Sequence, residues 1–518
     1  MIPSTQSQSV ATAGFHPELL SSLGIEKSRL VTDSRTIKPG DTFVAYPGSR
    51  TDGRQFITQA IASGANAVIW EAHDFAWDHA WQLPNLAVTN LRHHAGEIAA
   101  HVYGHPSKKL WTVGVTGTNG KTSCAHWIAQ SFGGLGKKTA LIGTLGNGFA
   151  GTLQPTLNTT PDAIRLHGLL ADYLAEGAQA VAMEVSSHAL EQGRVNGMQY
   201  DIALLTNLSR DHLDYHGDMR SYAAAKRRLF DWPNLKYAVL NFDDAFGIEL
   251  AELLQGREVE VVGYGLSDNA QVLAERFKCR MVAGSELRLN AQGFSVQVHS
   301  GWGSGELHGS LLGRFNAANL LGVLTVLLLS GVPLNEALRE LAQAKAVAGR
   351  MQSLGGGKQP TVVVDYAHTP DALEKVLQSL QELVAAGKGK LICVFGCGGD
   401  RDSGKRPMMG AVASTLADMC IVTSDNPRGE NPHNIIAAIT SGMVRHNYQI
   451  MEDRGAAITQ AISNAHVADM VLVAGKGHED YQEVQGVKSP FSDIAVAQHA
   501  LQVWCSPERF QEIRGGKA

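Results

Sequence analysis

A glycine-rich segment from Gly114 to Thr122 constrains the fold of this chain more than any other feature. It reads Gly-Val-Thr-Gly-Thr-Asn-Gly-Lys-Thr, follows the apolar residues 110–113 and leads into a further apolar stretch. Between a strand and a helix, such a loop binds nucleotide phosphates through its backbone N–H groups, a lysine and a hydroxyl that can ligate magnesium. The sequence therefore predicts a P-loop for ATP or GTP. The loop has five residues, 115–119, where the general motif has about four, which indicates a subfamily.

Length and composition restrict the class of protein. The 518 residues are enough for about three domains. The net charge of -5 gives no electrostatic footprint for nucleic acid or an anionic membrane, so we expect neither partner. Six cysteines without a Cys-x-x-Cys pair favour free thiols in a reducing cytosol over disulfides or a zinc site. The absence of a signal peptide pattern or a long apolar run predicts a cytoplasmic protein without membrane insertion.

Strand and helix patterns alternate along the chain and predict an α/β fold with three domains. We expect a small N-terminal α/β domain over residues 1–90, a central P-loop domain with a parallel sheet over 91–345, and a Rossmann-like domain over 346–518. Glycine-rich alternation over 287–312 predicts antiparallel hairpins, and residues 316–330 an apolar helix. Near-continuous apolar runs, typical of parallel strands covered on both faces, occupy 139–143, 180–184, 202–206, 238–241, 361–365, 391–395, 419–422 and 470–473.

Polar clusters follow many of these strands. In open α/β sheets, ligands bind beyond the carboxyl ends of the strands. Because the clusters belong to two separate sheets, the sequence predicts a cleft in which a nucleotide held by one domain meets a group held by the other. The clusters after the P-loop are 184–188, 207–216, 365–370, 396–402, 424–428 and 475–479.

Several residues in these clusters have more than one interpretation on sequence alone. Glu184 ends an apolar strand and is either a buried paired acid or a ligand beside the P-loop. His212 and His216 are four residues apart, but a zinc site lacks a third soft ligand. Lys226 lies in a basic run, whose default is a solvated helix face, and Asn316 and Asn319, at the start of the predicted apolar helix, could cap it.

Four motifs together resemble the Mur ligase family. They are Gly-Thr-Asn-Gly-Lys-Thr at 117–122, Glu-Val-Ser-Ser-His at 184–188, Asp-His-Leu-Asp-Tyr-His at 211–216 and Asp-Asn-Pro-Arg at 425–428. The match starts at Asp33-Ser34-Arg35, ends at the last polar cluster and keeps the family's order. It is closest to the branch that adds meso-diaminopimelate to UDP-N-acetylmuramoyl-L-alanyl-D-glutamate in peptidoglycan precursor synthesis. The resemblance implies one domain each for the uridine nucleotide, ATP and the incoming amino acid, and we expect a monomer.

The resemblance also implies a reaction. The γ-phosphate of the co-substrate ATP moves to the D-glutamate side-chain carboxylate, giving an acyl phosphate and ADP. The diaminopimelate amine then attacks and phosphate leaves as the amide forms. Because phosphoryl transfer depends on positioning and charge stabilisation, Lys121 and Mg²⁺ are expected at the phosphates.

Site residues follow from the family motifs. The implied catalytic residues are Lys121, Glu184, His212 and Lys226. The implied magnesium ligands are Thr122, Glu184, His212 and Lys226, the last as a carbamate. The implied ATP-binding residues are Gly117, Thr118, Asn119, Gly120, Lys121, Thr122, Ser123, Asn316, Asn319, Arg350 and Asp365. The implied contacts to the UDP-sugar peptide are Ser34, Asn158, Thr159, Thr160, Ser186, Gln192 and Arg194. The implied diaminopimelate contacts are Arg401, Asp425, Asn426, Pro427, Arg428, Gly475 and Glu479.

Three alternatives remain at this point. A lysine-adding ligase of the same family is disfavoured by Arg428, because a guanidinium can grip the extra carboxylate of diaminopimelate through two parallel hydrogen bonds. Lysine would leave that guanidinium unpaired. Folylpolyglutamate and cyanophycin synthetases share the P-loop but lack the 425–428 motif. A nucleotide-regulated switch protein would hydrolyse ATP slowly and without regard to either substrate.

Overall fold

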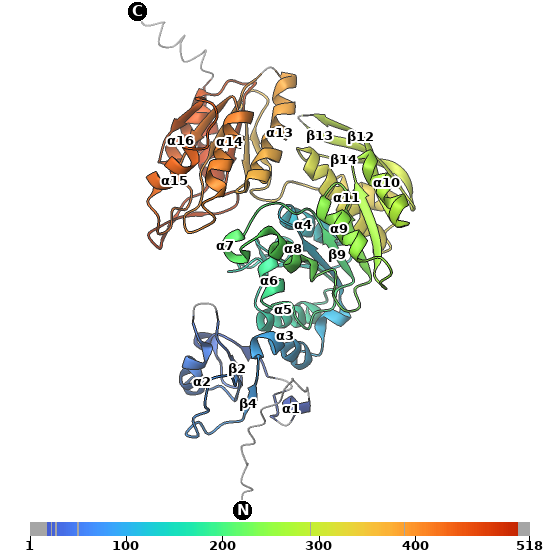
Figure 1. Cartoon of the computed structure of the whole chain (residues 1–518), viewed down its shortest axis with the longest axis vertical. Coiled ribbons are helices and arrows are strands. Elements are labelled where there is room, and N and C mark those ends of the chain that lie inside the picture. Colours follow the sequence, from blue (N-terminus) through green and yellow to red (C-terminus); the bar gives the residue numbers. More distant parts are fainter. Residues whose placement is uncertain are drawn as a thin grey trace, which may run out of the picture.

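A computed structural model describes residues 18–21, 23–25, 28–48, 51–290, 292–387 and 389–505. Three sheets, each with its own helices, follow one another along the long axis of the molecule (Figure 1). The predicted α/β class and the three-domain organisation are confirmed. The first and last residues of the predicted domains 1–90 and 346–518 lie outside the described part. No helix in the described part of the chain is long and apolar enough to span a membrane.

The N-terminal sheet has four parallel strands in the order β1-β2-β3-β4. Its strands are rich in apolar residues on both faces, and Val44 and Ile69 are almost fully buried on one side while Phe43 and Val68 are buried on the other. The strands are β1 (Leu30–Val31), β2 (Thr42–Ala45), β3 (Ala67–Glu71) and β4 (Asn85–Val88). The helices here are α1 (Glu18–Ser21), η1 (Ser34–Thr36), η2 (Gly53–Phe56), α2 (Ile57–Ala62), α3 (Leu91–Val102) and η3 (Pro106–Lys109).

The central sheet has ten strands in the order β14-β13-β12-β11-β10-β9-β5-β8-β6-β7. Its middle is parallel, while β7 and the hairpins β12-β13-β14 are antiparallel, as the glycine-rich alternation over 287–312 predicted for the latter. Strand bounds are β5 (Trp111–Thr116), β6 (Thr139–Gly143), β7 (Gly146–Phe149), β8 (Ala180–Glu184), β9 (Ile202–Leu205), β10 (Tyr237–Asn241), β11 (Glu260–Gly265), β12 (Arg280–Asn290), β13 (Gly293–Ser300) and β14 (Gly303–Gly309).

The helices of the central domain place the P-loop and its neighbours. The apolar helix α11 is buried along nearly its whole length and packs on α4, which begins at Lys121. Helix α5 begins after Asp162, whose carboxylate accepts from the backbone N–H of Arg165 as an N-cap. The helices are α4 (Lys121–Gly134), α5 (Ala163–Ala175), α6 (Ser187–Glu191), α7 (Leu213–His216), α8 (Met219–Arg227), α9 (Ala245–Leu253), α10 (Asp268–Phe277), α11 (Arg314–Leu329) and α12 (Leu334–Leu341).

The C-terminal sheet has six strands in the order β15-β16-β20-β17-β18-β19, all parallel except β15, and a separate hairpin β21-β22 follows it. The strands are β15 (Gln352–Gly355), β16 (Thr361–Asp365), β17 (Leu391–Phe395), β18 (Met419–Val422), β19 (Tyr448–Ile450), β20 (Met470–Ala474), β21 (Tyr481–Val484) and β22 (Val487–Pro490). The helices are α13 (Pro370–Gly387), α14 (Lys405–Leu416), α15 (Pro432–Thr440), α16 (Arg454–Asn464) and α17 (Asp493–Gln502).

A buried ion pair fixes the end of the central strand of this last sheet. The Arg454 guanidinium meets both carboxylate oxygens of Asp493 at 2.7 Å, and it also donates to the Ala474 carbonyl at 2.9 Å. Both side chains are fully buried. Because a buried pair with satisfied hydrogen bonds has a defined geometry, it holds Ala474, the residue at which β20 ends and the loop that starts at Gly475 begins.

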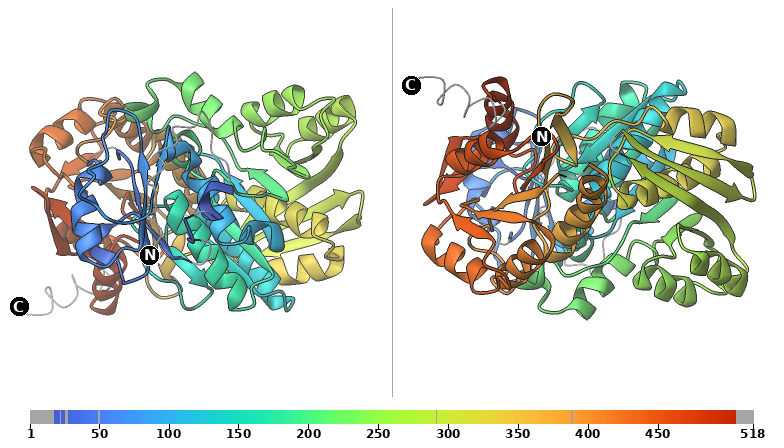
Figure 2. Two further views of the ribbon diagram at one scale, coloured as in Figure 1. Left: turned by 90° about the horizontal axis from the view of Figure 1, so that it is seen from below. Right: turned by 90° about the horizontal axis from the view of Figure 1, so that it is seen from above.

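Seen along the long axis, the orange and red C-terminal domain and the yellow-green hairpins of the central domain lie on opposite sides of the molecule (Figure 2). The carboxyl ends of the parallel strands of the two larger sheets carry the polar clusters that the sequence predicts to line a cleft. Side chains from the two domains meet there, as when Arg350 Nη2 donates to Thr122 Oγ1 at 3.2 Å.

Candidate active site

The P-loop joins the end of β5 to the start of α4. Gly117 has φ of +148° and Gly120 of +86°, which favour glycine, and a Cβ at Gly117 would collide with the Thr206 hydroxyl. Lys121 Nζ donates to the Gly117 and Thr118 carbonyls at 2.8 Å each. Burial lowers the pKa of the Lys121 ammonium. The loop thus joins a strand to a helix as its sequence predicted, which is the arrangement that suits a phosphate site.

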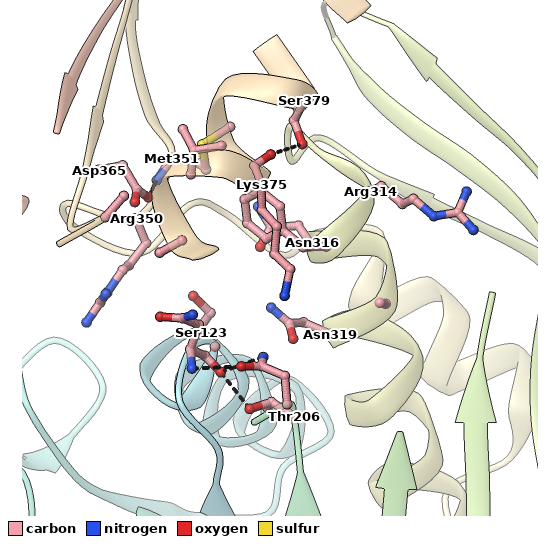
Figure 3. Close-up of a pocket in the computed structure, with 18 of the residues that line it drawn as sticks. Ser123, Thr206, Arg314, Asn316, Asn319, Arg350, Met351, Asp365, Lys375 and Ser379 are labelled. Carbon is pink, nitrogen blue, oxygen red and sulfur yellow. Dashed lines mark hydrogen bonds between the residues drawn. The ribbon is translucent and has the colours of Figure 1, made fainter. Parts of the chain in front are cut away.

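A cavity of about 350 Å³ opens beside the P-loop, between the central and C-terminal domains (Figure 3). In Figure 3, Lys375 extends from α13 toward Asn319 on α11, and Ser123 lies on the facing helix α4. Leu266 and Phe315 form an apolar wall of the cavity, which is suited to a nucleobase. Seven of the predicted ATP-binding residues line it: Asn119, Gly120, Ser123, Asn316, Asn319, Arg350 and Asp365.

Asp365 holds the segment that links the two domains. Its carboxylate accepts from the backbone N–H of Met351 at 2.7 Å, and Met351 has a positive φ of 47°. Burial raises the pKa of the Asp365 carboxyl, and the charge of Arg350 opposes that shift. The Arg350 guanidinium lies 4.5 Å above the Tyr366 ring. Together these contacts place Arg350 and Asp365 on the same side of the nucleotide cavity.

A second cavity of about 430 Å³ adjoins the first and shares Asn119, Gly120, Arg350 and Tyr366 with it. It therefore extends the nucleotide cavity past the phosphate end of the P-loop. Many predicted residues of four different groups line it: Thr118, Lys121, Thr122, Asn158, Thr159, Glu184, Ser186, Arg194, His212, Lys226 and Arg401. The structure brings predicted phosphate, metal and peptide contacts together here, and of the predicted diaminopimelate contacts Arg401 lines this cavity.

Two of the predicted magnesium ligands touch each other. Thr122 Oγ1 donates to Glu184 Oε2 at 2.9 Å, and Glu184 also accepts from the backbone N–H and the hydroxyl of Thr144 at 2.8 and 3.1 Å. Desolvation lowers the pKa of His212, whose side chain is still 42% exposed, so its imidazole is neutral at pH 7 and has a lone pair for a metal. A hydroxyl, a carboxylate and an imidazole beside phosphate-binding N–H groups fit a magnesium ion completed by phosphate oxygens.

No three His, Cys, Asp or Glu side chains of the described residues are grouped so as to hold a metal ion by themselves. His216, the partner of His212 in the zinc interpretation, instead shares a hydrogen bond of 3.0 Å with the Ser187 hydroxyl. The donor set at the P-loop thus suits a cation that is also held by the nucleotide.

Lys226 is buried and not solvated, which corrects the default interpretation of a basic helix run. Its side chain reaches back from α8, and Nζ donates to the Gly117 carbonyl at 2.7 Å and lies 4.5 Å from the Tyr222 ring. Burial, and after it the charge of Lys121, lowers the pKa of Lys226 well below its ordinary value. The lowered pKa favours the neutral amine, which is the form that reacts with carbon dioxide.

Asp211 and His368 are functional candidates to which the sequence analysis gave no role. Asp211 Oδ2 lies 3.3 Å from His212 Nε2 and 3.7 Å from His368 Nε2, so one carboxylate touches histidines of two domains. Burial alone would raise the pKa of Asp211, but its contacts with His368 and His212 hold it far below its usual range. Both residues lie in the polar clusters after strands, which was the available signal.

The predicted diaminopimelate residues form a third group. Asn426 Nδ2 donates to Glu479 Oε2 at 2.8 Å. Gly475 has φ of +118°, and a Cβ at this position would lie only 2.6 Å from an Asp425 oxygen, so the site requires glycine there. Arg428 has φ of +50° and donates from Nη1 to the Gly399 carbonyl at 2.8 Å. The Pro427 carbonyl accepts from the backbone N–H of Glu430 at 3.0 Å, so the proline contributes to the turn.

Lys476 is a further member of this group that the sequence analysis missed. It is fully buried, and its Nζ donates to Asn426 Oδ1 at 3.0 Å and to Glu479 Oε2 at 3.2 Å. The ammonium therefore fixes the amide of Asn426 and balances the charge of Glu479. Its place in a glycine-rich cluster directly after β20 was the only hint in the sequence.

The predicted contacts to the UDP-sugar peptide lie in different places. Asn158, Thr159, Ser186 and Arg194 line the second cavity. Thr160 Oγ1 donates to the Glu184 carbonyl at 2.8 Å, and Gln192 Oε1 accepts from Arg194 Nε at 2.9 Å, so these two support their neighbours. Ser34 does not line that cavity; its buried hydroxyl donates to Gln59 Oε1 at 3.1 Å within the N-terminal domain.

Fold and site together define an ATP-dependent ligase class, in which a P-loop domain and a C-terminal α/β domain face each other across a divided cavity. The chain belongs to the Mur ligase family. Its residues 28–103 match the family model described as Mur ligase family, catalytic domain. Residues 115–327 match Mur ligase middle domain, and residues 349–477 match Mur ligase, glutamate ligase domain.

Individual relatives match over nearly the full length. A protein of Nitrosomonas europaea named UDP-N-acetylmuramoyl-L-alanyl-D-glutamate-2,6-diaminopimelate ligase is 49% identical over 98% of this chain and 99% of its own. A protein of the same name from Chromobacterium violaceum is 52% identical over 96% of this chain and 99% of its own. A solved structure of a ligase with that name is 36% identical, with a TM-score of 0.64, over 91% of this chain and 94% of its own.

Proposed function

We propose that this chain is an ATP-dependent, ADP-forming ligase that joins meso-diaminopimelate to the D-glutamate side-chain carboxylate of UDP-N-acetylmuramoyl-L-alanyl-D-glutamate in cytoplasmic peptidoglycan precursor synthesis. The proposal depends above all on the 49% and 52% identity, over nearly the whole chain, to two ligases of that name. The adjoining cavities support it, because they join the phosphate loop to Arg194 and Arg401, two cations suited to anionic substrate groups.

The same proposal assigns one ligand to each domain. Residues 1–90 would bind the uridine nucleotide, 91–345 ATP and 346–518 the incoming amino acid. Ser34 would act in the first domain, at a distance from the phosphates, which suits a long substrate that spans two domains. We expect the protein to work as a monomer.

The first step brings two anions together, the γ-phosphate of ATP and the substrate carboxylate. The P-loop N–H groups and Lys121 would hold the phosphates, and Arg194 and Arg401, which line the second cavity, would offset the charge of the acceptor. Mg²⁺ held by Thr122, Glu184 and His212 would supply charge neutralisation at the transferring phosphoryl group. The products of this step are an acyl phosphate and ADP.

In the second step the diaminopimelate amine attacks the acyl carbon, and phosphate leaves as the amide forms. The substrate ammonium must lose one proton before attack and the nitrogen a second one as the amide forms, and the phosphate or a neutral imidazole can accept a proton. Asp425, Asn426, Gly475 and Glu479 would hold the amino and carboxylate groups of the substrate. Arg428 would bind the carboxylate that lysine lacks.

Lys226 would act as a carbamate. Its amine, buried beside Lys121, would add carbon dioxide in the neutral form and release a proton, and the product would be an anionic oxygen ligand suited to a second magnesium ion. An electron-density map of crystals grown with nucleotide at neutral pH tests this directly. An unmodified Lys226 amine in that map would reject the carbamate and leave the ligase proposal standing.

Phosphate release with and without each substrate tests the function. We expect release from ATP only when both UDP-N-acetylmuramoyl-L-alanyl-D-glutamate and meso-diaminopimelate are present, and very little when L-lysine replaces diaminopimelate. Equal rates with lysine would identify the lysine-adding relative. Slow release that ignores both substrates would identify a nucleotide-regulated switch.

A further inference from the structure

We propose that Glu483 is the resident counter-ion of Arg428, and that the distal carboxylate of the amino-acid substrate displaces it during binding. Glu483 Oε2 lies 3.7 Å from Arg428 Nε, and the two side chains are 22% and 19% exposed. This inference rests on the proposed function, because it concerns how Arg428 recognises diaminopimelate. It makes Glu483 a residue that sets the specificity of the ligase.

The backbone of Glu483 is held against the loop 425–428 through both its N–H and its carbonyl. Its N–H donates to Asn426 Oδ1 at 2.9 Å, and its carbonyl accepts from the N–H of Arg428 at 3.0 Å. One residue pair further along, the N–H of Gln485 donates to the Arg428 carbonyl at 2.7 Å. Strand β21 is thus attached to the loop, so the Glu483 carboxylate cannot move away from the guanidinium by more than its own side-chain rotation.

The pair between Glu483 and Arg428 is exchangeable. A separation of 3.7 Å is longer than a charge-assisted hydrogen bond, which is about 2.7–2.9 Å. A substrate carboxylate could make two short parallel bonds to the same guanidinium, which has five donors and uses Nη1 for the Gly399 carbonyl. The substrate contact is therefore the stronger of the two, and it can replace the internal one without movement of Arg428.

Lys488 offers a second partner to the displaced carboxylate. Glu483 and Lys488 are directly opposite in the antiparallel register of β21 and β22, which puts their side chains on one face of the hairpin. Lys488 Nζ lies 4.0 Å from the Tyr481 ring, on the same face. A side-chain rotation thus exchanges Arg428 for Lys488 while the hairpin stays in place.

The exchange has an effect on the choice of substrate. When diaminopimelate binds, the Glu483 carboxylate repels the distal carboxylate of the substrate and weakens its binding. With lysine bound, Arg428 keeps Glu483 and is not left unpaired, so the penalty for the wrong substrate is smaller. Glu483 therefore lowers the affinity for diaminopimelate and also narrows the discrimination against lysine.

The test is the nearly isosteric substitution Glu483→Gln in the full chain. We expect the KM for diaminopimelate to fall about 3- to 10-fold, the size of one screened charge contact. The ratio of kcat/KM for diaminopimelate to that for lysine should rise by at least the same factor. The KM values for ATP and for the UDP-sugar peptide should stay unchanged, and the melting temperature reports that the variant is folded.

Two controls separate this role from a general charge effect. Asp480→Asn removes a charge from the same segment at a residue with no ion pair to Arg428 in the described part of the chain, and we expect no change in discrimination. Lys488→Gln should raise the KM for diaminopimelate about 2-fold when Glu483 is present and have no effect in the double variant with Glu483→Gln.

An increase in the KM for diaminopimelate in Glu483→Gln would overturn the proposal, because it would mean that the carboxylate binds a substrate ammonium. An unchanged KM, or equal changes for both amino acids, would reject it too. Failure of the proposed function has a different signature: the unsubstituted protein would then show no turnover that depends on diaminopimelate.

Discussion

Replacing the Asp211 carboxylate by an amide tests how the site orients His212, the proposed magnesium ligand. Asp211 Oδ2 lies 3.3 Å from His212 Nε2. A carboxylate beside Nε2 favours the tautomer with the proton on that nitrogen, which leaves the Nδ1 lone pair for a metal. An asparagine keeps the shape but can offer N–H donors to Nε2, which favours the opposite tautomer. Asp211→Asn should therefore weaken magnesium binding and leave the fold intact.

The size of the effect follows from the contact. A hydrogen bond to a charged group contributes about 1.5–3 kcal/mol, and partners of metal-bound histidines typically change metal affinity by about 10- to 100-fold. The His212 side chain is 42% exposed, and solvent screens the contact, so the low end applies. We expect the magnesium concentration for half-maximal activity to rise about 10-fold, which corresponds to about 1.4 kcal/mol.

The assay is ADP formation against magnesium concentration, with all three substrates saturating. Asp214→Asn is the matched control, because Asp214 lies in the same motif but is exposed. Its magnesium dependence should equal that of the unsubstituted protein. If Asp211→Asn lowers kcat but leaves the magnesium dependence unchanged, the carboxylate acts through the contact with the C-terminal domain and the tautomer argument is wrong.

Three other predictions concern the amino-acid site, the P-loop and a buried histidine. Arg428→Ala should lower kcat/KM for diaminopimelate about 100-fold, the loss of a charge-assisted pair, without changing the Kd for ATP; titration calorimetry and steady-state kinetics measure both. Gly117→Ala should raise the Kd for ATP at least about 100-fold, because of backbone strain and collision with Thr206, whereas Gly133→Ala, with open space around its Cβ, should be neutral. Burial lowers the pKa of His167 to about 4 from 6.5, so the unfolded chain takes up the proton first and stability falls from pH 6.5 down to about 4. The free energy of unfolding should fall by about 3 kcal/mol over this range, and urea unfolding should show a smaller fall in His167→Gln. An equal pH dependence in the variant would contradict the assignment of this fall to His167.

The sequence predicted those features that depend on short-range pattern. The P-loop lies between a strand and a helix as its glycines required, and the strands ending at Glu184 and Asp365 have the predicted ends. Several short strands were missed, among them β7 (Gly146–Phe149) and β22 (Val487–Pro490). Both contain glycine or polar residues and form hairpins at an edge, where pairing and not apolar pattern decides the structure.

Burial and contacts between domains were beyond the sequence. Lys226 belongs to a run of charged residues, and only the fold of α8 against the P-loop shows that it is buried. Asp211 and His368 come from different domains, so their contact depends on how two sheets are placed. Ser34 differs from these residues, because the fold keeps it away from the other predicted contacts. Its motif gave no indication that it lies outside the second cavity.

The contacts between the two larger domains surround the phosphate end of the site. Asn119 Nδ2 donates to Asp371 Oδ2 at 3.2 Å, and Arg210 meets Asp402 at 3.3 Å, beside the contact of Asp211 with His368. An acyl phosphate is readily hydrolysed, so a ligase must exclude water once it has formed. Because the residues that join the domains are neighbours of those that line the cavities, contact between the domains would also complete the site. Disruption of these contacts should therefore increase ADP release relative to amide formation, and not merely slow both.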